Sequence, residues 1–121
     1  MTEERIKIGK KGESEAVKYL KNNGYEIIDR NFQKRYGEID IVAQKNKELV
    51  FVEVRSKTGF EFGLPEETVG KEKKRRLMKN VKYYLKYNDF GLPYRIDVIG
   101  IVFNKNKEVE RLKHYKNVTL F

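Results

Sequence analysis

The sequence has 121 residues, of which 39% are hydrophobic and 12% aromatic, and this composition predicts a single domain over residues 1–121 with one buried core. It has no cysteine, which excludes disulfides, zinc ribbons and thiol nucleophiles. Because it also lacks a signal-like or membrane-length apolar run, we expect a cytoplasmic protein that does not engage membranes. The net charge of +9, from 27 Lys and Arg against 18 Asp and Glu, favours a polyanionic partner.

Hydrophobic periodicity and turn residues predict the elements along the chain. They are, in order, a helix over 5–23, strands over 25–32, 37–43 and 49–56, a loop over 57–68, a helix ending near 87, and strands over 94–103 and 108–115. The order is one helix, three strands, a second helix and two strands. It predicts an α/β domain in which a mixed β-sheet is flanked by helices.

The positive charge is concentrated in the second predicted helix. Between Lys71 and Lys86, eight basic residues and one acid supply +7 of the net +9. Because each neutralised phosphate releases condensed counterions, this stretch favours nucleic acid over a merely solvated face. The predicted nucleic-acid contacts are Lys57, Lys71, Lys74, Arg75, Arg76, Lys79 and Lys82.

The second and third predicted strands read as a hairpin with a two-residue turn at Asn46-Lys47. In that register, paired residue numbers sum to 93. Ile41 then meets Val52 and Ile39 meets Val54, all on one apolar face. The register depends on the turn, and a slip of one residue would move every side chain to the other face.

The opposite face of this hairpin is predicted to bring Asp40 across from Glu53. Directly opposed Cβ atoms lie about 5 Å apart, and like charges there are destabilising. Two such carboxylates either have a raised pKa or hold a cation. Mg²⁺ prefers oxygen ligands of this kind, whereas the plainer alternative is a pair of surface acids beside lysines.

The motifs resemble those of a known family. An aspartate followed thirteen residues later by Glu53-Val54-Arg55 is similar to the D…(D/E)xK signature of the PD-(D/E)XK nuclease superfamily. More closely, the chain from about residue 9 to 101 resembles the YraN-like family, which is similar to archaeal Holliday-junction resolvases. The motifs that carry this resemblance are Gly12-Glu13, Ala16, Tyr19-Leu20, Gly24-Tyr25, Arg30-Asn31, Gly37-Glu38-Ile39-Asp40, Phe51-Val52-Glu53-Val54-Arg55, Phe62-Gly63 and Arg95-Ile96-Asp97-Val98.

The resemblance implies a restriction-endonuclease-like fold and a set of site residues. Asp40 and Glu53 would bind Mg²⁺, with Mn²⁺ as a substitute, aided by the backbone carbonyl of Val54. Glu13 would support the metal or its water. Independently, Glu13 precedes Ala16 by three positions and so shares the inward stripe of its helix, although an acid that complements the helix dipole is the alternative.

Arg55 departs from the superfamily signature, which has lysine at this position. An arginine cannot lose its proton and therefore cannot serve as a general base, but it can clamp a phosphate. Lys57 and Lys73 are the two lysines that could supply the missing role. Lys73 is preferred because it lies four residues before Leu77, at the inner end of the helix stripe.

Together these features predict a Mg²⁺-dependent endonuclease that hydrolyses phosphodiesters in DNA, branched or structured DNA in particular. Arg55 and Lys73 would hold the scissile phosphate while an activated water attacks phosphorus. Two alternatives stay open: a non-catalytic nucleic-acid-binding protein that keeps the nuclease fold, and an RNA-processing nuclease. A homodimer is a further expectation, because two opposed DNA strands need two sites.

Other polar residues receive plainer interpretations. Asp97 interrupts an apolar strand and is predicted to form a structural ion pair with Arg95, Arg30 or a nearby lysine. His114, the only histidine, is predicted to be solvated. Tyr84 lies at core spacing in the second helix.

Overall fold

The computed structural model describes residues 2–34, 36–61, 63–88 and 91–118. Its elements follow the predicted order. They are α1 (Glu3–Asn22), β1 (Glu26–Lys34), β2 (Gly37–Lys45), β3 (Glu48–Thr58), the short 3-10 helix η1 (Pro65–Thr68), α2 (Lys71–Tyr87), β4 (Tyr94–Phe103) and β5 (Val109–Tyr115). The main difference is η1, which lies within the segment predicted as a loop.

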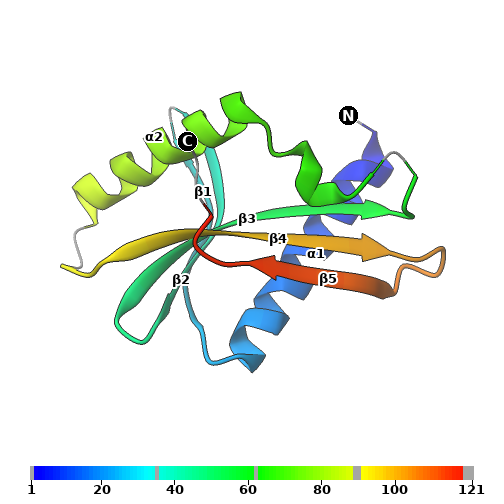
Figure 1. The fold of residues 1–121 in the computed structure, drawn as a ribbon, viewed down its shortest axis with the longest axis horizontal. Helices are drawn as coiled ribbons and strands as arrows, with labels where there is room; N and C mark the ends of the chain where they lie inside the picture. Colours follow the sequence, from blue (N-terminus) through cyan, green and yellow to red (C-terminus); the bar gives the residue numbers. More distant parts are fainter. Residues whose placement is uncertain (1, 35, 62, 89–90, 119–121) are drawn as a thin grey trace.

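The five strands form one mixed sheet in the order β1-β2-β3-β4-β5. Only the β3–β4 pair is parallel, because η1 and α2 form the crossover between these two strands. The two helices cover opposite faces of the sheet (Figure 1). The predicted α/β fold with a mixed, helix-flanked sheet is confirmed, and it is consistent with a restriction-endonuclease-like fold.

Helix α1 is held against the sheet by a stripe of buried residues. Thr2 caps its N-terminus by accepting the N–H of Arg5, and two acidic residues in the first turn complement the helix dipole. Its buried residues are Ile8, Gly12, Ala16, Val17 and Leu20. At Gly12 the helix lies so close to β3 that an added Cβ would be 2.7 Å from the Cβ of Ser56. The glycine therefore sets the distance between α1 and the sheet.

The predicted β2–β3 register is correct for the five pairs nearest the turn. Asn46 and Lys47 have φ values of 51° and 62°, as a two-residue hairpin turn of the type I′ kind requires. The pairs run from Lys45↔Glu48 to Ile41↔Val52, and each sums to 93. The described ladder ends there, so Asp40 and Glu53 are not a ladder pair.

The prediction that Ile39 shares a face with Ile41 was wrong. Ile41 packs in the α1-side core, whereas Ile39 packs in the α2-side core. The two strands change faces between the pairs Arg30↔Ile41 and Phe32↔Ile39, and Asn31, which lies between them, has a left-handed φ of 53°. This backbone rotation turns the side chains beyond it toward the other helix.

Within the described ranges, neither helix combines the length and the apolar run that crossing a bilayer requires.

Candidate active site

Asp40 lies at the point where β2 and β3 separate. Its Oδ2 accepts the N–H of Val54 at 2.7 Å, a bond that takes the place of the next ladder contact between the strands. Because the strand changes faces here, the carboxyl group interacts electrostatically with acids on both sides of the sheet, Glu13 on the α1 side and Glu53 on the α2 side. Asp40 is therefore the centre of the candidate site.

The α1 side of this centre is acidic. One oxygen from each of Glu13, Glu38 and Asp40 lies within 4.8 Å of the others, a spacing that could hold a metal ion. Asn31 joins two of them, because its side-chain amide donates to Glu13 Oε1 and to Glu38 Oε1, the latter at 2.9 Å. Asn31, whose φ lies in the left-handed region, thus turns the strand and also fixes the side chains of Glu13 and Glu38.

The α2 side pairs a buried acid with two cations. The Glu53 residue is only 1% exposed. Its Oε1 lies 3.3 Å from Lys73 Nζ and 3.6 Å from the Arg55 guanidinium. Its Oε2 is buried and has no hydrogen-bond partner in the part of the chain that the structure describes. A buried carboxylate oxygen without a partner is costly, and a ligand that binds there would relieve that cost.

The carboxyl groups raise one another's proton affinity. Burial, then the charge of Glu53, then a hydrogen bond shared with Glu38 raise the pKa of Asp40 to about 9, against the N–H bond from Val54. Burial also raises the pKa of Glu53, although Lys73 and Arg55 oppose it. The pKa of Glu13 is raised by burial as well, with the Asn31 bond acting the other way. Without a cation, this cluster retains protons that ordinary carboxyls release.

Val54 is placed to offer a second backbone group. The N–H and C=O of a strand residue point toward the same neighbouring strand. Since the Val54 N–H donates to Asp40, its carbonyl also faces β2 and the gap beside Asp40.

The short helix η1 supports the cationic side. Thr68 accepts the Nε–H of Arg55 at 2.8 Å and donates to the Pro65 carbonyl, so η1 fixes the guanidinium. At the other end of η1, Glu66 accepts two bonds from Arg111 of β5, at 3.1 and 2.8 Å. Gly100 leaves the room for this contact, because a Cβ there would be 2.2 Å from Glu66 Oε1.

Residues 12–101 match the model of uncharacterised protein family UPF0102. The chain belongs to this family. Among its relatives are UPF0102 proteins of Persephonella marina, 48% identical over 79% of this chain and 84% of the relative, and of Desulforamulus reducens, 44% identical over 97% and 98%. A third, from Carboxydothermus hydrogenoformans, is 45% identical over 97% of this chain and 98% of its own.

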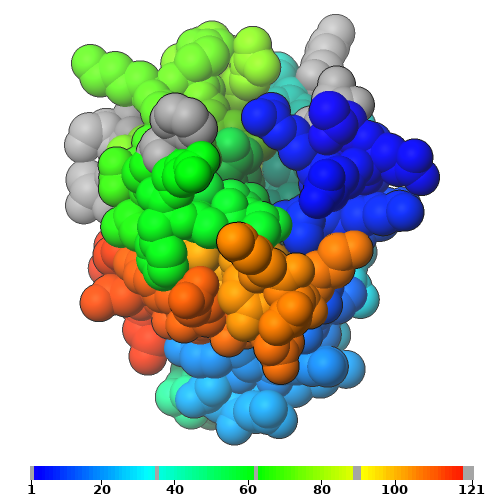
Figure 2. Space-filling model, turned by 90° about the vertical axis from the view of Figure 1, so that its right-hand side faces the viewer, coloured from blue at the N-terminus to red at the C-terminus, as the bar shows by residue number. Residues whose placement is uncertain are grey.

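Membership in UPF0102 confirms the resemblance to the YraN-like family. The matched range contains Glu13, Glu38, Asp40 and Glu53, which together are called the acidic centre. The sequence-predicted residues Glu13, Asp40, Glu53, Arg55 and Lys73 come together around the gap between β2 and β3. In Figure 2 the blue start of α1 and the green segment of η1 and α2 stand apart, and darker strand atoms lie deeper between them.

Sequence reasoning missed Glu38 and Asn31 as parts of the site. Both lie in the motifs that carried the family resemblance, Arg30-Asn31 and Gly37-Glu38-Ile39-Asp40, and this was the available signal. Strand alternation predicted Glu38 opposite Arg55 instead, because it did not anticipate the change of face at Asn31.

Three of the predicted nucleic-acid contacts already bond to other groups of the chain. Arg75 and Arg76 both pair with Glu72, with closest N–O distances of 2.7 and 3.3 Å. Lys57 donates to the carbonyls of Glu61 and Gly63 and so fastens the loop after β3. The remaining predicted contacts, Lys71, Lys74, Lys79 and Lys82, are exposed or half-buried along α2.

The prediction that His114 is solvated was wrong. Its side chain is 4% exposed, and its Nε2 lies 2.7 Å from Asp97 Oδ2 while Nδ1 lies 3.0 Å from the Tyr19 hydroxyl. The expected ion pair of Asp97 with Arg95 is present, at 3.0 Å. This network joins α1, β4 and β5, away from the acidic centre, and its role is structural.

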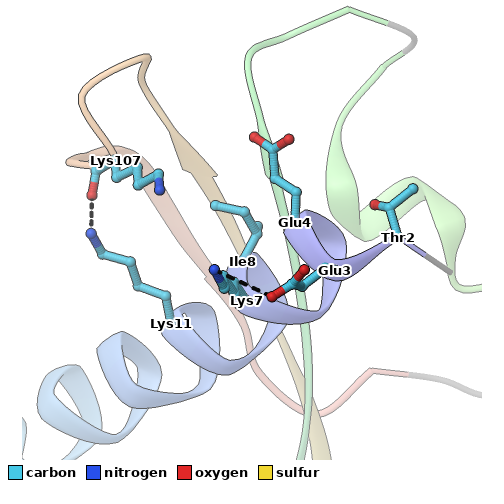
Figure 3. Close-up of a pocket in the computed structure, with 7 residues that line it drawn as sticks. All are labelled: Thr2, Glu3, Glu4, Lys7, Ile8, Lys11 and Lys107. Carbon is cyan, nitrogen blue, oxygen red and sulfur yellow. Dashed lines mark hydrogen bonds and ion pairs between the residues drawn. The ribbon is translucent and has the colours of Figure 1, made fainter.

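A separate hollow lies between the start of α1 and the β4–β5 turn and has a volume of about 620 Å³ (Figure 3). Its charged residues offset one another: Lys7 pairs with Glu3, and Lys11 donates to the Lys107 carbonyl. This is the seam where α1 meets the turn, and it brings no convergent set of catalytic groups together.

Proposed function

We propose that this UPF0102 protein is a divalent-metal-dependent endonuclease that hydrolyses phosphodiesters in DNA. The observation that carries the proposal is the placement of Asp40, whose carboxyl group lies between an acidic cluster on one side and Glu53 with its two cations on the other. Carboxylates that bind metal beside cations that bind phosphate are what phosphodiester hydrolysis requires.

Membership in the PD-(D/E)XK superfamily is part of the same proposal. Asp40 and the Glu53-Val54-Arg55 run resemble its signature, and the helix-flanked mixed sheet is consistent with its fold. The substitution of arginine for the signature lysine is accompanied by a lysine from another element, because Lys73 of α2 reaches the same Glu53 oxygen that Arg55 approaches.

The donor set fits a hard divalent cation. All the side-chain candidates are carboxylates, and Glu53 keeps a buried oxygen, Oε2, without a partner among the described residues. Asp40 and Glu53 would hold Mg²⁺ or Mn²⁺ with the Val54 carbonyl, and Glu13 and Glu38 would contribute directly or through water. When bound, the ion would supply Lewis acidity toward water and a phosphate oxygen.

The remaining roles belong to groups of the chain itself. Glu13, oriented by Asn31, accepts a hydrogen bond from the attacking water, and its raised pKa makes Oε2 a stronger proton acceptor than an ordinary glutamate. Lys73 and Arg55 share their charge between Glu53 and a non-bridging phosphate oxygen. They stabilise the negative charge that grows on phosphorus oxygens as the 3′ oxygen departs.

DNA is the proposed substrate because α2 presents its exposed lysines beside this centre. Branched DNA, a cytoplasmic location and action as a homodimer belong to the same proposal. A protein that binds nucleic acid without cleaving it is the second candidate, since Arg55 cannot act as a base; RNA is the alternative substrate.

The test is metal-dependent cleavage of a panel of end-labelled substrates by the full chain. The panel contains four-way junction, flap, duplex and single-stranded DNA, each with an RNA counterpart, in Mg²⁺, Mn²⁺ or EDTA. We expect Asp40→Asn, which keeps an acceptor for the Val54 N–H, to lower the cleavage rate by about 10²- to 10³-fold. Equal nicking by both proteins would identify a contaminant and end the proposal.

A second comparison isolates the cationic side. We expect Lys73→Ala to lower the cleavage rate by about tenfold or more, whereas Lys105→Ala, the same charge change in the β4–β5 turn, has no effect on it. Calorimetric Mn²⁺ titration should show binding to wild type and Lys73→Ala but not to Asp40→Asn. Full cleavage by Lys73→Ala would remove the role given to that lysine.

A further inference from the structure

A second hollow lies on the outer side of α2 and has no part in the mechanism above. Its volume is about 340 Å³, and it is lined by Tyr36, Lys79, Lys82, Tyr83 and Lys86. The four α2 residues recur at helical spacing and so share one stripe, while Tyr36 comes from the β1–β2 turn. The lining therefore consists of two aromatic rings and three cations, with no acid among the residues that line it.

The hollow is built on a fixed support. Asn80, which is fully buried, donates to the Gly37 carbonyl at 2.7 Å and so ties the β1–β2 turn to α2. In Figure 1 the cyan ends of β1 and β2 next to this turn lie beside the helix. The ring of Tyr83 packs beside Phe32 and Tyr87, with centroid distances of 6.4 and 4.9 Å. The ring of Tyr83 is therefore held in place before any ligand arrives, and the backbone next to Tyr36 is tied to α2.

The lining matches the chemistry of an unpaired nucleotide. Single-stranded nucleic acid is bound by aromatic rings on which bases stack, together with cations that contact the phosphates. Lys79 already lies 5.5 Å from the Tyr36 ring centroid, which brings a cation and an aromatic face together. Duplex DNA offers only phosphates here, because its base faces are stacked on each other. An acidic peptide would use the lysines and leave the rings without a partner.

The hollow also lies close to the acidic centre. Tyr36 precedes Glu38 by two residues and Asp40 by four, about 13 Å of extended chain. Along α2, Lys86 follows Lys73 by thirteen residues, about 20 Å of helix. If the unpaired nucleotides of a DNA strand occupy the hollow, a phosphodiester a short distance further along the same strand would therefore lie at Asp40.

We propose that the hollow between Tyr36 and Tyr83 binds unpaired nucleotides of DNA, stacking a base on these rings and holding the flanking phosphates with Lys79, Lys82 and Lys86. It thereby directs cleavage to the boundary between paired and unpaired DNA, a consequence that rests on the proposed function. The binding itself does not need cleavage and is tested separately.

The experiment measures fluorescence anisotropy of a labelled oligothymidylate and of a labelled blunt duplex, both in EDTA. Because stacking on one ring contributes about 1–3 kcal/mol in such sites, we expect Tyr36→Ala and Tyr83→Ala each to weaken single-strand binding by about 5- to 150-fold. Duplex binding should change less than about twofold. Tyr36→Phe, which keeps the ring, should bind both probes as wild type does.

The lysines have their own control. Lys82→Ala should lower the salt dependence of single-strand binding, whereas Lys105→Ala, with the same charge change outside the hollow, should not. Unchanged single-strand binding in both tyrosine-to-alanine variants would overturn the inference. So would an equal loss for the two probes, since that result describes a merely basic face. Tighter binding of oligouridylate than of oligothymidylate would overturn the assignment to DNA.

Failure of this inference and failure of the nuclease proposal give different results. The Asp40→Asn variant should bind oligothymidylate as wild type does. If no substrate is cleaved and single-strand binding still depends on the two rings, the hollow is supported and the nuclease proposal fails. If Asp40→Asn abolishes cleavage but Tyr36→Ala and Tyr83→Ala leave the cleavage rate of every substrate unchanged, the role given to the hollow is refuted and the nuclease proposal stands.

Discussion

Replacing Asp40 with asparagine should make the metal-free protein more stable at pH 8. The asparagine keeps the shape of the side chain and an oxygen for the Val54 N–H, but removes the charge that burial and Glu53 oppose. The pKa of Asp40 is raised from an ordinary 3.8 to about 9, and one pKa unit corresponds to about 1.36 kcal/mol. At pH 8, the unfolded carboxyl is ionised while the folded one still holds its proton.

The full difference at pH 8 corresponds to about 6 kcal/mol of lost stability. Water that enters the strand gap and rotation of the Asp40 side chain would reduce this loss of stability. We therefore expect the asparagine to raise the free energy of unfolding by about 2–3 kcal/mol. A carboxyl whose pKa is raised on folding binds its proton more tightly in the folded state. Stability is therefore highest below about pH 4 for this group, and is lost as the pH rises toward about 9.

Urea denaturation between pH 5 and pH 9 measures the effect. Wild type should lose stability across this range in EDTA, and Asp40→Asn should lose less. Saturating Mn²⁺ should stabilise wild type, by about 2.7 kcal/mol at a hundredfold excess over its Kd, and leave the variant unchanged. Glu110→Gln removes an exposed carboxylate from β5 and is the matched control. Parallel pH profiles for wild type and Asp40→Asn, or a less stable variant at pH 8, would refute this account of the site.

Three further substitutions test the scaffold. Gly12→Ala should destabilise the fold by about 1–3 kcal/mol because the new Cβ meets Ser56. Gly9→Ala, with nothing within 4 Å of its Cβ, should instead stabilise the same helix by about 0.5–1 kcal/mol. Thermal denaturation measures both effects, and equal stabilisation by the two variants would contradict the close approach of α1 to β3. Asp97→Asn should cost about 3 kcal/mol in urea at pH 7, because it removes the buried negative charge to which Arg95 and His114 are bonded. Burial raises the pKa of Asp97, but bonds from His114, Arg95 and a backbone N–H lower it overall. The contribution of Asp97 to the free energy of unfolding is therefore present above about pH 4 and is lost as the pH falls below the lowered pKa. An acid transition of wild type that matches that of Asp97→Asn would contradict this.

Local chemistry explains why much of the fold was predictable. Asn46 tolerates positive φ, and a two-residue turn leaves only one register, so the hairpin pairs nearest the turn followed from the turn alone. Helix boundaries followed from periodicity and from the glycine after α1. The position of Lys73 near Glu53 was also predictable, because a stripe residue in the first turn of α2 must face the sheet.

Features that depend on distant contacts were not predictable from patterns. The alternation of a strand says nothing of a left-handed residue within it, so the rotation at Asn31 and the recruitment of Glu38 came only from the structure. The flanks of His114 are polar and suggested solvent, yet Tyr19 of α1 and Asp97 of β4 enclose it. Both cases involve partners far along the chain, which local propensity does not encode.

The charges around Asp40 are arranged unequally on the two sides of the sheet. On the α1 side, Glu13 and Glu38 both accept from the neutral amide of Asn31, and the ion pairs described for the structure include neither of them. Only the more distant charge of Arg30 offsets part of the negative charge of Glu13. On the α2 side, two cations already offset Glu53. A divalent cation gains most by entering from the α1 side, and a phosphate gains most from the α2 side. In the proposed nuclease, the metal would therefore lie between Asp40 and Glu53 in the gap between β2 and β3, where the scissile phosphate reaches it from the α2 side and the DNA lies along α2.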